Sequence, residues 1–345
     1  MGASLTAAAC TVGEGCAFPY STSVVGPGFL FLEHGGASAL VLMTWRMECV
    51  FLFLLPFSLY EIYLAPRRLR RQWLERTTVV TTIVAGLGWG GTLACYVLAL
   101  SFTSTLRASL MSSLTPLVLL AYYAYTGQRI SRGELWGAVL ATLGMAICFL
   151  NDSDPERSAD FGMAVTVTPD ADGGAAAAAP TAAALVAGHA LFGDVLATAA
   201  SVFTAVDVEY SLVARQTLPL FTFSAAAAVA AGALVALCAV VFEGATLGIS
   251  LHGLLGWLLP EYFYPVLVFS FVVGFLAILG FNHAVKYVPP LVFSVIILME
   301  PVLTGIFSFE IGLEALPSLW TGLGGAVILA GILLVVVNDS VPHAH

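Results

Sequence analysis

Apolar segments about 20 residues long alternate along this chain with short loops that carry its basic residues. Nine of the twelve Lys and Arg residues fall in four loops that a single membrane topology places on one side of a bilayer. They are Arg67, Arg68, Arg70, Arg71 and Arg76 in the first loop, Arg129 and Arg132 in the second, and Arg215 and Lys286 in two more. Because basic loops gather on the cytoplasmic side of spanning helices, the pattern predicts an all-α polytopic membrane protein.

The composition argues against a soluble domain. Of the 345 residues, 59% are apolar and 10% are charged, whereas soluble domains have about 45–50% and about 25%. No basic patch interleaves with aromatic residues, so we expect no nucleic-acid partner. The cysteine and histidine spacings predict neither a disulfide framework nor a metal site. No catalytic or nucleotide-binding motif is present, so we predict a protein that is not an enzyme and uses no cofactor.

Nine segments have the length and apolarity of a membrane-spanning helix. They lie near residues 37–59, 78–101, 104–125, 133–150, 188–212, 217–242, 263–284, 289–309 and 318–338. A tenth candidate, residues 16–32, is short and is interrupted by proline and glycine. We therefore predict about ten spanning helices in an integral, multi-pass protein of the plasma membrane or an endomembrane, with both termini cytoplasmic.

The chain divides into two halves with the character of repeats. Residues 151–187 change from acidic to Ala-rich, which predicts an extramembrane linker between a first five-helix repeat, 1–150, and a second, 188–345. A shift of 185 residues brings Ser109 onto Ser294 and aligns helix breakers and packing glycines of the two halves. An odd number of helices per half inverts the second half. This arrangement predicts the inverted repeats of many secondary transporters, with a solute site near the membrane midplane.

Two ionisable residues lie near the middle of expected spans. Arg46 is about nine residues into the segment 37–59, and Glu300 is about eleven residues into 289–309. A charge in the hydrocarbon core is costly unless it faces a cavity or a partner. Two interpretations stay open: Arg46 and Glu300 face a central solute cavity, or they form a structural ion pair that locks two helices.

Three further sets of residues are candidate walls of the cavity, each on one face of an expected helix. They are Ser109, Ser112 and Ser113 in 104–125, Asp194, Thr198 and Ser201 in 188–212, and Trp89 with Tyr96 in 78–101. Small hydroxyl residues either line a water-filled path or allow close helix packing. The aromatic pair suits a cavity wall and a core- or lipid-facing position equally.

Helix breakers and small residues complete the pattern. Pro116 and Pro301 occupy the same repeat position, where each removes one helical hydrogen bond at mid-membrane. They are candidate kinks for alternating access, with passive kinks as the alternative. Close helix packing is expected where small residues recur four apart. These sets are Gly86 with Gly90, Gly133 with Gly137 and Ala141, and Gly322 with Ala326.

Spaced motif residues occupy the last third of the chain: Ala284, Pro289, Pro290, Ser294, Glu300-Pro301, Gly312-Leu313-Glu314 and Gly322. This run resembles the second repeat of the EamA-like family in the drug/metabolite transporter superfamily, and Ser109, Pro116, Gly127 and Gly137 carry a looser likeness in the first half. In the first half, Thr115 stands at the position equivalent to Glu300. The resemblance implies ten helices in two inverted repeats and carriage of small organic metabolites by alternating access.

We therefore expect a secondary transporter of a small polar organic metabolite. The alternatives are a non-transporting membrane receptor or scaffold and, within transporters, a nucleotide-sugar or sugar-phosphate exchanger. The exchanger needs several cationic groups in the cavity, and only Arg46 and Arg107 lie within helices, with Lys286 at an edge. Expected partners are a small-molecule solute, the lipid bilayer and a coupling ion or counter-substrate, and a homodimer is compatible with the sequence.

Overall fold

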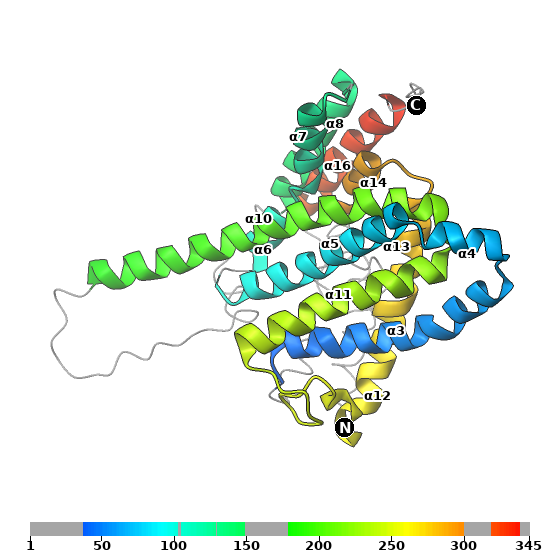
Figure 1. The fold of residues 1–345 in the computed structure, drawn as a ribbon. Coiled ribbons are helices and arrows are strands. Elements are labelled where there is room, and N and C mark those ends of the chain that lie inside the picture. Colours follow the sequence, from blue (N-terminus) through cyan, green and yellow to red (C-terminus); the bar gives the residue numbers. More distant parts are fainter. Residues whose placement is uncertain (1–36, 103–104, 129, 149–178, 300–318, 339–345) are drawn as a thin grey trace, which may run out of the picture.

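The computed structural model describes residues 37–102, 105–128, 130–148, 179–299 and 319–338, and Figure 1 shows its fold. Within these ranges the chain is mostly helical and has no strand, apart from one isolated bridge between Thr246 and Gly253. Five helical segments are long and apolar enough to cross a membrane, which is consistent with an integral membrane protein. They are Ala39–Leu64, Arg76–Leu100, Leu191–Thr217, Leu220–Glu243 and Pro260–Val285.

The described helices follow the expected apolar segments closely. Those of the first half are α3 (Ala39–Leu64), α4 (Arg67–Trp73), α5 (Arg76–Leu100), α6 (Thr105–Ser112), α7 (Thr115–Thr126) and α8 (Arg132–Cys148). Those of the second half are α10 (Ala179–Thr217), α11 (Leu220–Glu243), the 3-10 turn η1 (Gly256–Leu258), α12 (Pro260–Phe269), the π-helical segment η2 (Ser270–Leu276), α13 (Ala277–Val285), α14 (Pro290–Ile297) and α16 (Leu319–Asn338). The tenth candidate span, 16–32, lies outside the described residues.

Helix α10 begins earlier than the sequence predicts. Residues 151–187 are expected to form a flexible linker, but α10 already starts at Ala179. Its first turns are rich in alanine, the residue with the highest helix propensity, so composition alone favours the helix there. Residues 151–178 lie outside the described part of the chain.

The expected span 104–125 is two helices rather than one. Helix α6 ends at Ser112, and α7 begins at Thr115 after a two-residue turn. Pro116 lies in the first turn of α7, where the N–H that proline lacks has no helical partner in any case. The prediction that Pro116 removes a hydrogen bond within a continuous helix is therefore wrong, because the helix is already interrupted before the proline.

Helices α5 and α11 pack at unusually short range. A Cβ atom added to Gly86 would lie 2.6 Å from the Ala227 carbonyl oxygen, and one added to Gly90 would lie 2.7 Å from the Ala231 carbonyl oxygen. The predicted close packing through this glycine pair is confirmed. On its other side α5 runs antiparallel to α10, where the Thr92 hydroxyl is 3.0 Å from that of Thr204.

A second close contact joins α8 to α16 (Figure 1). A Cβ on Gly137 would lie 2.7 Å from the Gly331 carbonyl oxygen, and one on Gly331 would lie 2.6 Å from the Gly137 carbonyl oxygen. Close packing of Gly137 is thus confirmed. It is not found at Gly322, whose added Cβ would have no neighbour within 4 Å among the described residues.

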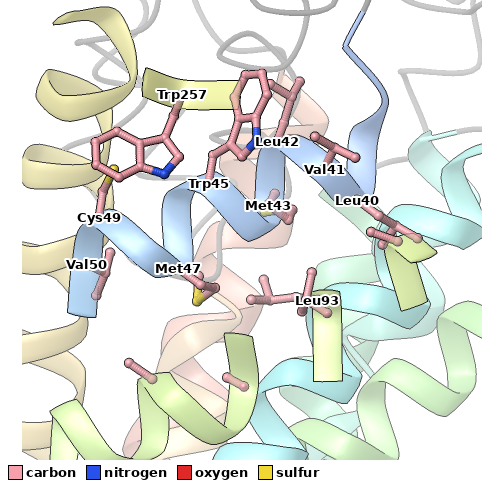
Figure 2. Close-up of a cluster of buried hydrophobic side chains, with 14 of the residues drawn as sticks. Leu40, Val41, Leu42, Met43, Trp45, Met47, Cys49, Val50, Leu93 and Trp257 are labelled. Atoms are coloured by element: carbon pink, nitrogen blue, oxygen red, sulfur yellow. The ribbon is translucent and has the colours of Figure 1, made fainter. Parts of the chain in front are cut away.

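The largest apolar cluster joins α3, α5, α11 and the segment that follows α11. Figure 2 shows Trp45, Met47 and Cys49 of α3 among its members, with Leu93 of α5 and Trp257 of η1 nearby. Trp45, Cys49 and Leu40 are fully buried. The first half of α3 is therefore enclosed by protein over its whole circumference, and any polar group on it must find its partner inside the molecule.

Candidate functional site

Arg46 lies in this enclosed half of α3, with 3% of its surface exposed. Its Nη2 atom donates a hydrogen bond to the Val273 carbonyl oxygen at 3.3 Å. The guanidinium carbon lies 6.0 Å from the centroid of the Phe269 ring, which adds a cation–π contact. The backbone dipole and the aromatic face both stabilise the buried cation.

The partner of Arg46 is an irregular stretch of helix. The span Pro260–Val285 changes from α12 to the π-helical η2 and back to α13. A π-helical turn shifts the hydrogen-bond register by one residue, and such turns are frequent at functional sites. Gly274 of η2 lies against Val50, and a Cβ added to it would be 3.7 Å from the Arg46 Nε atom. The missing side chain lets α3 approach η2 closely enough for the contact.

Two tryptophans close one end of α3. The Trp45 indole donates to the Gly253 carbonyl oxygen at 2.8 Å, and the Trp257 indole donates to the Glu48 carboxylate at 2.7 Å. Gly253 and Trp257 both belong to the connection between α11 and α12, which folds back over α3. Glu48 points to a different side of α3 from Arg46, and its carboxylate accepts a hydrogen bond from the Trp257 indole of this connection.

The polar stripe on α10 turns inward and bonds to its own helix. The Thr198 hydroxyl donates to the Asp194 carbonyl oxygen at 2.8 Å, and the Ser201 hydroxyl donates to the Thr198 carbonyl oxygen at 2.7 Å. Ser201 has no exposed surface. The Thr115 hydroxyl, at the start of α7, is 3.5 Å from the Ser201 carbonyl oxygen, so the stripe meets the α6–α7 interruption.

The remaining predicted site residues fall in different places. Ser112 and Ser113 are half-buried at the α6–α7 interruption. Trp89 is buried in the large cluster around α3, whereas Tyr96 is buried in a separate cluster with residues of α6 and α10. The side chain of Ser109, and Glu300 and Pro301 entirely, lie outside the described residues. The structure therefore places Trp89 in the apolar cluster that contains α3, with no described contact to Arg46, and Ser201 near the interruption.

A buried polar cluster that the sequence did not indicate joins α10, α11 and α13. Arg215 is 4% exposed, and it donates from Nε to the Asn282 carbonyl oxygen at 3.0 Å and from Nη1 to the Leu218 carbonyl oxygen at 2.5 Å. The Asn282 amide donates to the Ser224 hydroxyl at 2.8 Å. The sequence pattern did not mark this cluster, because Arg215 lies beyond the expected helix end at 212 and its acceptors are backbone carbonyl oxygens.

A tyrosine and a carboxylate connect α7 to α10. The Tyr123 hydroxyl donates to the Glu209 carboxylate at 3.0 Å. Tyr123 lies near the C-terminal end of α7, which Gly127 caps, and Glu209 lies in the C-terminal part of α10, which ends at Thr217. The contact therefore joins α7 to α10 on the C-terminal side of the interruption. Among the described residues, no three His, Cys, Asp or Glu side chains gather in a group suited to a metal ion.

Comparisons with known proteins identify a fold and no more. No family model matches the chain, and no curated protein is significantly similar to it. A solved crystal structure, described only as that of a protein, has the same fold with a TM-score of 0.63. The two sequences are 16% identical, and the match covers 97% of this chain and 99% of the other. The fold thus recurs over essentially the whole length of another chain.

Proposed function

We propose that this protein is a secondary transporter that moves a small polar organic solute across a membrane by alternating access, as a distant member of the drug/metabolite transporter superfamily. The observation that carries the proposal is the matching bounds of two short helices, one in each half. Adding 185 to the bounds of α6, Thr105–Ser112, gives the bounds of α14, Pro290–Ile297. Each helix ends in a turn, which occupies residues 113–114 after α6 and includes residues 298–299 after α14.

Interrupted helices at corresponding positions of two halves are typical of secondary transporters, in which they form the solute site near the midplane. The same shift carries α5, Arg76–Leu100, onto residues 261–285, and the observed span is Pro260–Val285. The agreement of bounds supports two repeats of one structural unit. The bounds agree even though the amino-acid sequences of the paired helices are quite different.

The packing of the halves on one another also supports the proposal. Helix α3 packs against α11 and α8 packs against α16, so each pair joins helices that the shift relates approximately. In addition, α5 of the first half packs on α11, and the α12–η2 segment of the second half packs on α3. An exchange of the two halves reproduces this set of contacts. Rocking of one repeat against the other is the motion that such an arrangement supports.

A non-transporting receptor or scaffold is the second candidate, and one observation favours it. Arg46 is almost fully buried, and it contacts a backbone carbonyl and a phenyl ring of the same chain. If this contact is a permanent lock, the arginine stabilises the fold and meets no solute. In a transporter the same contact belongs to one state of the cycle and is exchanged for a solute in another.

An uptake and exchange screen in proteoliposomes separates the two candidates. Labelled amino acids, amines, nucleosides, sugars and sugar phosphates are offered to the wild type and to Arg46→Lys, Arg46→Gln and Glu300→Gln variants. For a transported solute, we expect each substitution at Arg46 to lower uptake at least tenfold. Arg132→Gln is the matched control, because Arg132 is exposed at the start of α8 and its loss should leave uptake unchanged.

The outcome is read together with the unfolding temperature of each purified variant in detergent. Uptake that falls in Arg46→Lys while the unfolding temperature stays within a few degrees of wild type supports the transporter. Uptake that persists in both Arg46 variants contradicts the proposed role of Arg46. No uptake of any solute class by the wild type, together with a large loss of stability in Arg46→Gln, favours the scaffold.

A further inference from the structure

Helix α4 connects the two spanning helices α3 and α5 and carries the densest positive charge of the described chain. Its seven residues include Arg67, Arg68, Arg70 and Arg71, and all four are exposed. Arg76 follows at the start of α5 and is exposed as well, while Glu75 is the only acidic residue in this stretch. This stretch thus has five arginines and one glutamate, whereas the second basic loop of the chain has two arginines.

The two sides of α4 differ in character. With about 3.6 residues per turn, Leu69 and Trp73 lie on one side, and Arg67, Arg68 and Arg71 lie on the other. Trp73 packs against the apolar cluster at the α10–α11 corner, which includes Leu218 and Phe223. The anchoring of Trp73 fixes the rotation of α4 about its axis. It therefore directs the three arginines, which we call the α4 arginine face, away from the helical bundle.

Apolar and aromatic side chains around α4 mark the depth at which it lies. Tyr60 and Tyr63, in the last turns of α3, are 64% and 80% exposed. Leu69 is 43% exposed and Leu74 is 77% exposed. Tyrosines gather at the level of lipid headgroups, and exposed leucines beside arginines are typical of helices that lie in the interface. The α4 arginine face is therefore level with the headgroups of the adjoining leaflet.

We propose that the α4 arginine face is a binding site for the headgroups of anionic phospholipids in the leaflet that adjoins the α3–α5 connection. Guanidinium groups match phosphate and carboxylate in charge and in bidentate geometry. Clusters of four to eight basic residues next to a spanning helix are attracted to anionic lipid surfaces. This inference requires only the spanning helices α3 and α5, and it holds whether or not the protein transports a solute.

Arg70 has a different role from its neighbours and is left unchanged in the test. Its Nε atom donates to the Ala65 carbonyl oxygen at 2.9 Å, at the end of α3, so its loss would disturb the connection itself. The test variant is therefore Arg67→Gln, Arg68→Gln and Arg71→Gln combined. A second triple variant carries Lys at the same three positions, which keeps the charge. Arg132→Gln removes one exposed arginine elsewhere.

The experiment equilibrates the full-length chain with micelles of equal phosphatidylserine and phosphatidylcholine content, and native mass spectrometry then measures the ratio of the two lipids that remain bound. We expect the wild type to retain mainly phosphatidylserine. Each arginine contributes roughly a fivefold preference for phosphatidylserine. The ratio of bound phosphatidylserine to bound phosphatidylcholine should therefore fall by more than about tenfold in the Gln triple variant. The Lys variant and Arg132→Gln should keep most of the preference.

Three results would overturn the proposal. One is a wild type without preference for phosphatidylserine, and another is a Gln triple variant that retains the wild-type ratio. The third is displacement of the bound lipid by millimolar inorganic phosphate, which would identify a site for soluble anions instead. Because the three arginines are exposed, we expect the variants to keep the wild-type unfolding temperature, and this control separates loss of lipid binding from loss of fold.

Discussion

Two glutamates show how single residues hold the ends of helices together. Glu243, the last residue of α11, accepts hydrogen bonds from the Ser38 hydroxyl at 2.6 Å and from the Leu40 N–H at 3.0 Å, at the start of α3. Glu61, near the end of α3, accepts from the Thr222 N–H at 2.7 Å at the start of α11. Each antiparallel helix thus caps the other with a carboxylate, which also suits the positive end of the helix dipole.

The cap at Glu61 gives a prediction at the scale of one residue. Glu61→Ala leaves the Phe221 and Thr222 N–H groups at the first turn of α11 without a side-chain acceptor. We expect the free energy of unfolding to fall by about 1–2 kcal/mol, measured by thermal unfolding in detergent. Glu75→Ala is the control, because Glu75 is the N-cap residue of α5 but its side chain makes no capping hydrogen bond. Equal effects of the two substitutions would refute the capping role.

The sequence predicted the locations of charged residues better than their partners. It placed Arg46 inside a span and left open whether the arginine faces a solute or a fixed partner, and the described contact is with the carbonyl of Val273. A backbone carbonyl has no signature in the sequence. The same is true of Arg215, whose partners are carbonyl oxygens of Leu218 and Asn282. Long-range partners depend on the packing of helices, which apolar periodicity does not determine.

At the scale of whole helices, apolar length predicted the bounds of some helices well, and proline marked interruptions less directly. The bounds of α5 and α16 lie within two residues of the expected segments, because long apolar runs have few alternatives in a membrane. The interruption after α6 was expected as a kink at Pro116. Glycine spacing predicted the α5–α11 contact but chose Gly322 in α16, where the contact is at Gly331. Spacing alone does not show which face meets a neighbour.

Two glycines of α16 allow this distinction to be tested within one helix. In Gly331→Ala the new Cβ would lie 2.6 Å from the Gly137 carbonyl oxygen and 2.7 Å from the Ala141 nitrogen, both rigid backbone atoms. We expect α8 and α16 to separate, with a loss of about 1–3 kcal/mol in the free energy of unfolding. Gly322→Ala meets no described residue within 4 Å and should be neutral or gain about 0.5–1 kcal/mol from helix propensity. Thermal unfolding of both variants in the same detergent measures the difference in stability. A Gly331→Ala protein as stable as the wild type would contradict the close contact between α8 and α16.

At the scale of the molecule, the structure brings separate basic segments to one end of the helical bundle. Glu61 contacts the start of α11, so α4 and the α10–α11 corner lie at the same end of the antiparallel α3–α11 pair. Arg215 contacts Asn282, which brings the end of α13 and Lys286 to that end as well. The opposite end holds the α11–α12 connection, because Glu243 contacts Ser38. The helical bundle therefore has one end that carries the basic segments and an opposite end that carries the α11–α12 connection.

This separation of ends predicts the accessibility of three surface positions in sealed membranes. In a background without native cysteines, cysteine replaces Gln72 of α4, Gln128 after α7, or Ile249 in the α11–α12 connection, all of which are exposed. A membrane-impermeant maleimide should label Ile249→Cys from one side of oriented vesicles, and Gln72→Cys and Gln128→Cys only from the other. The physical reason is that basic loops are retained on the cytoplasmic side, whichever membrane the protein occupies. Permeabilised vesicles, in which all three cysteines should react, control for reactivity. Labelling of Gln72→Cys and Gln128→Cys from opposite sides would contradict the common basic end. The 185-residue shift takes Gln72 into the α11–α12 connection, so labelling of Ile249→Cys from the same side as Gln72→Cys would contradict the proposed opposed orientation of the two halves, on which alternating access depends.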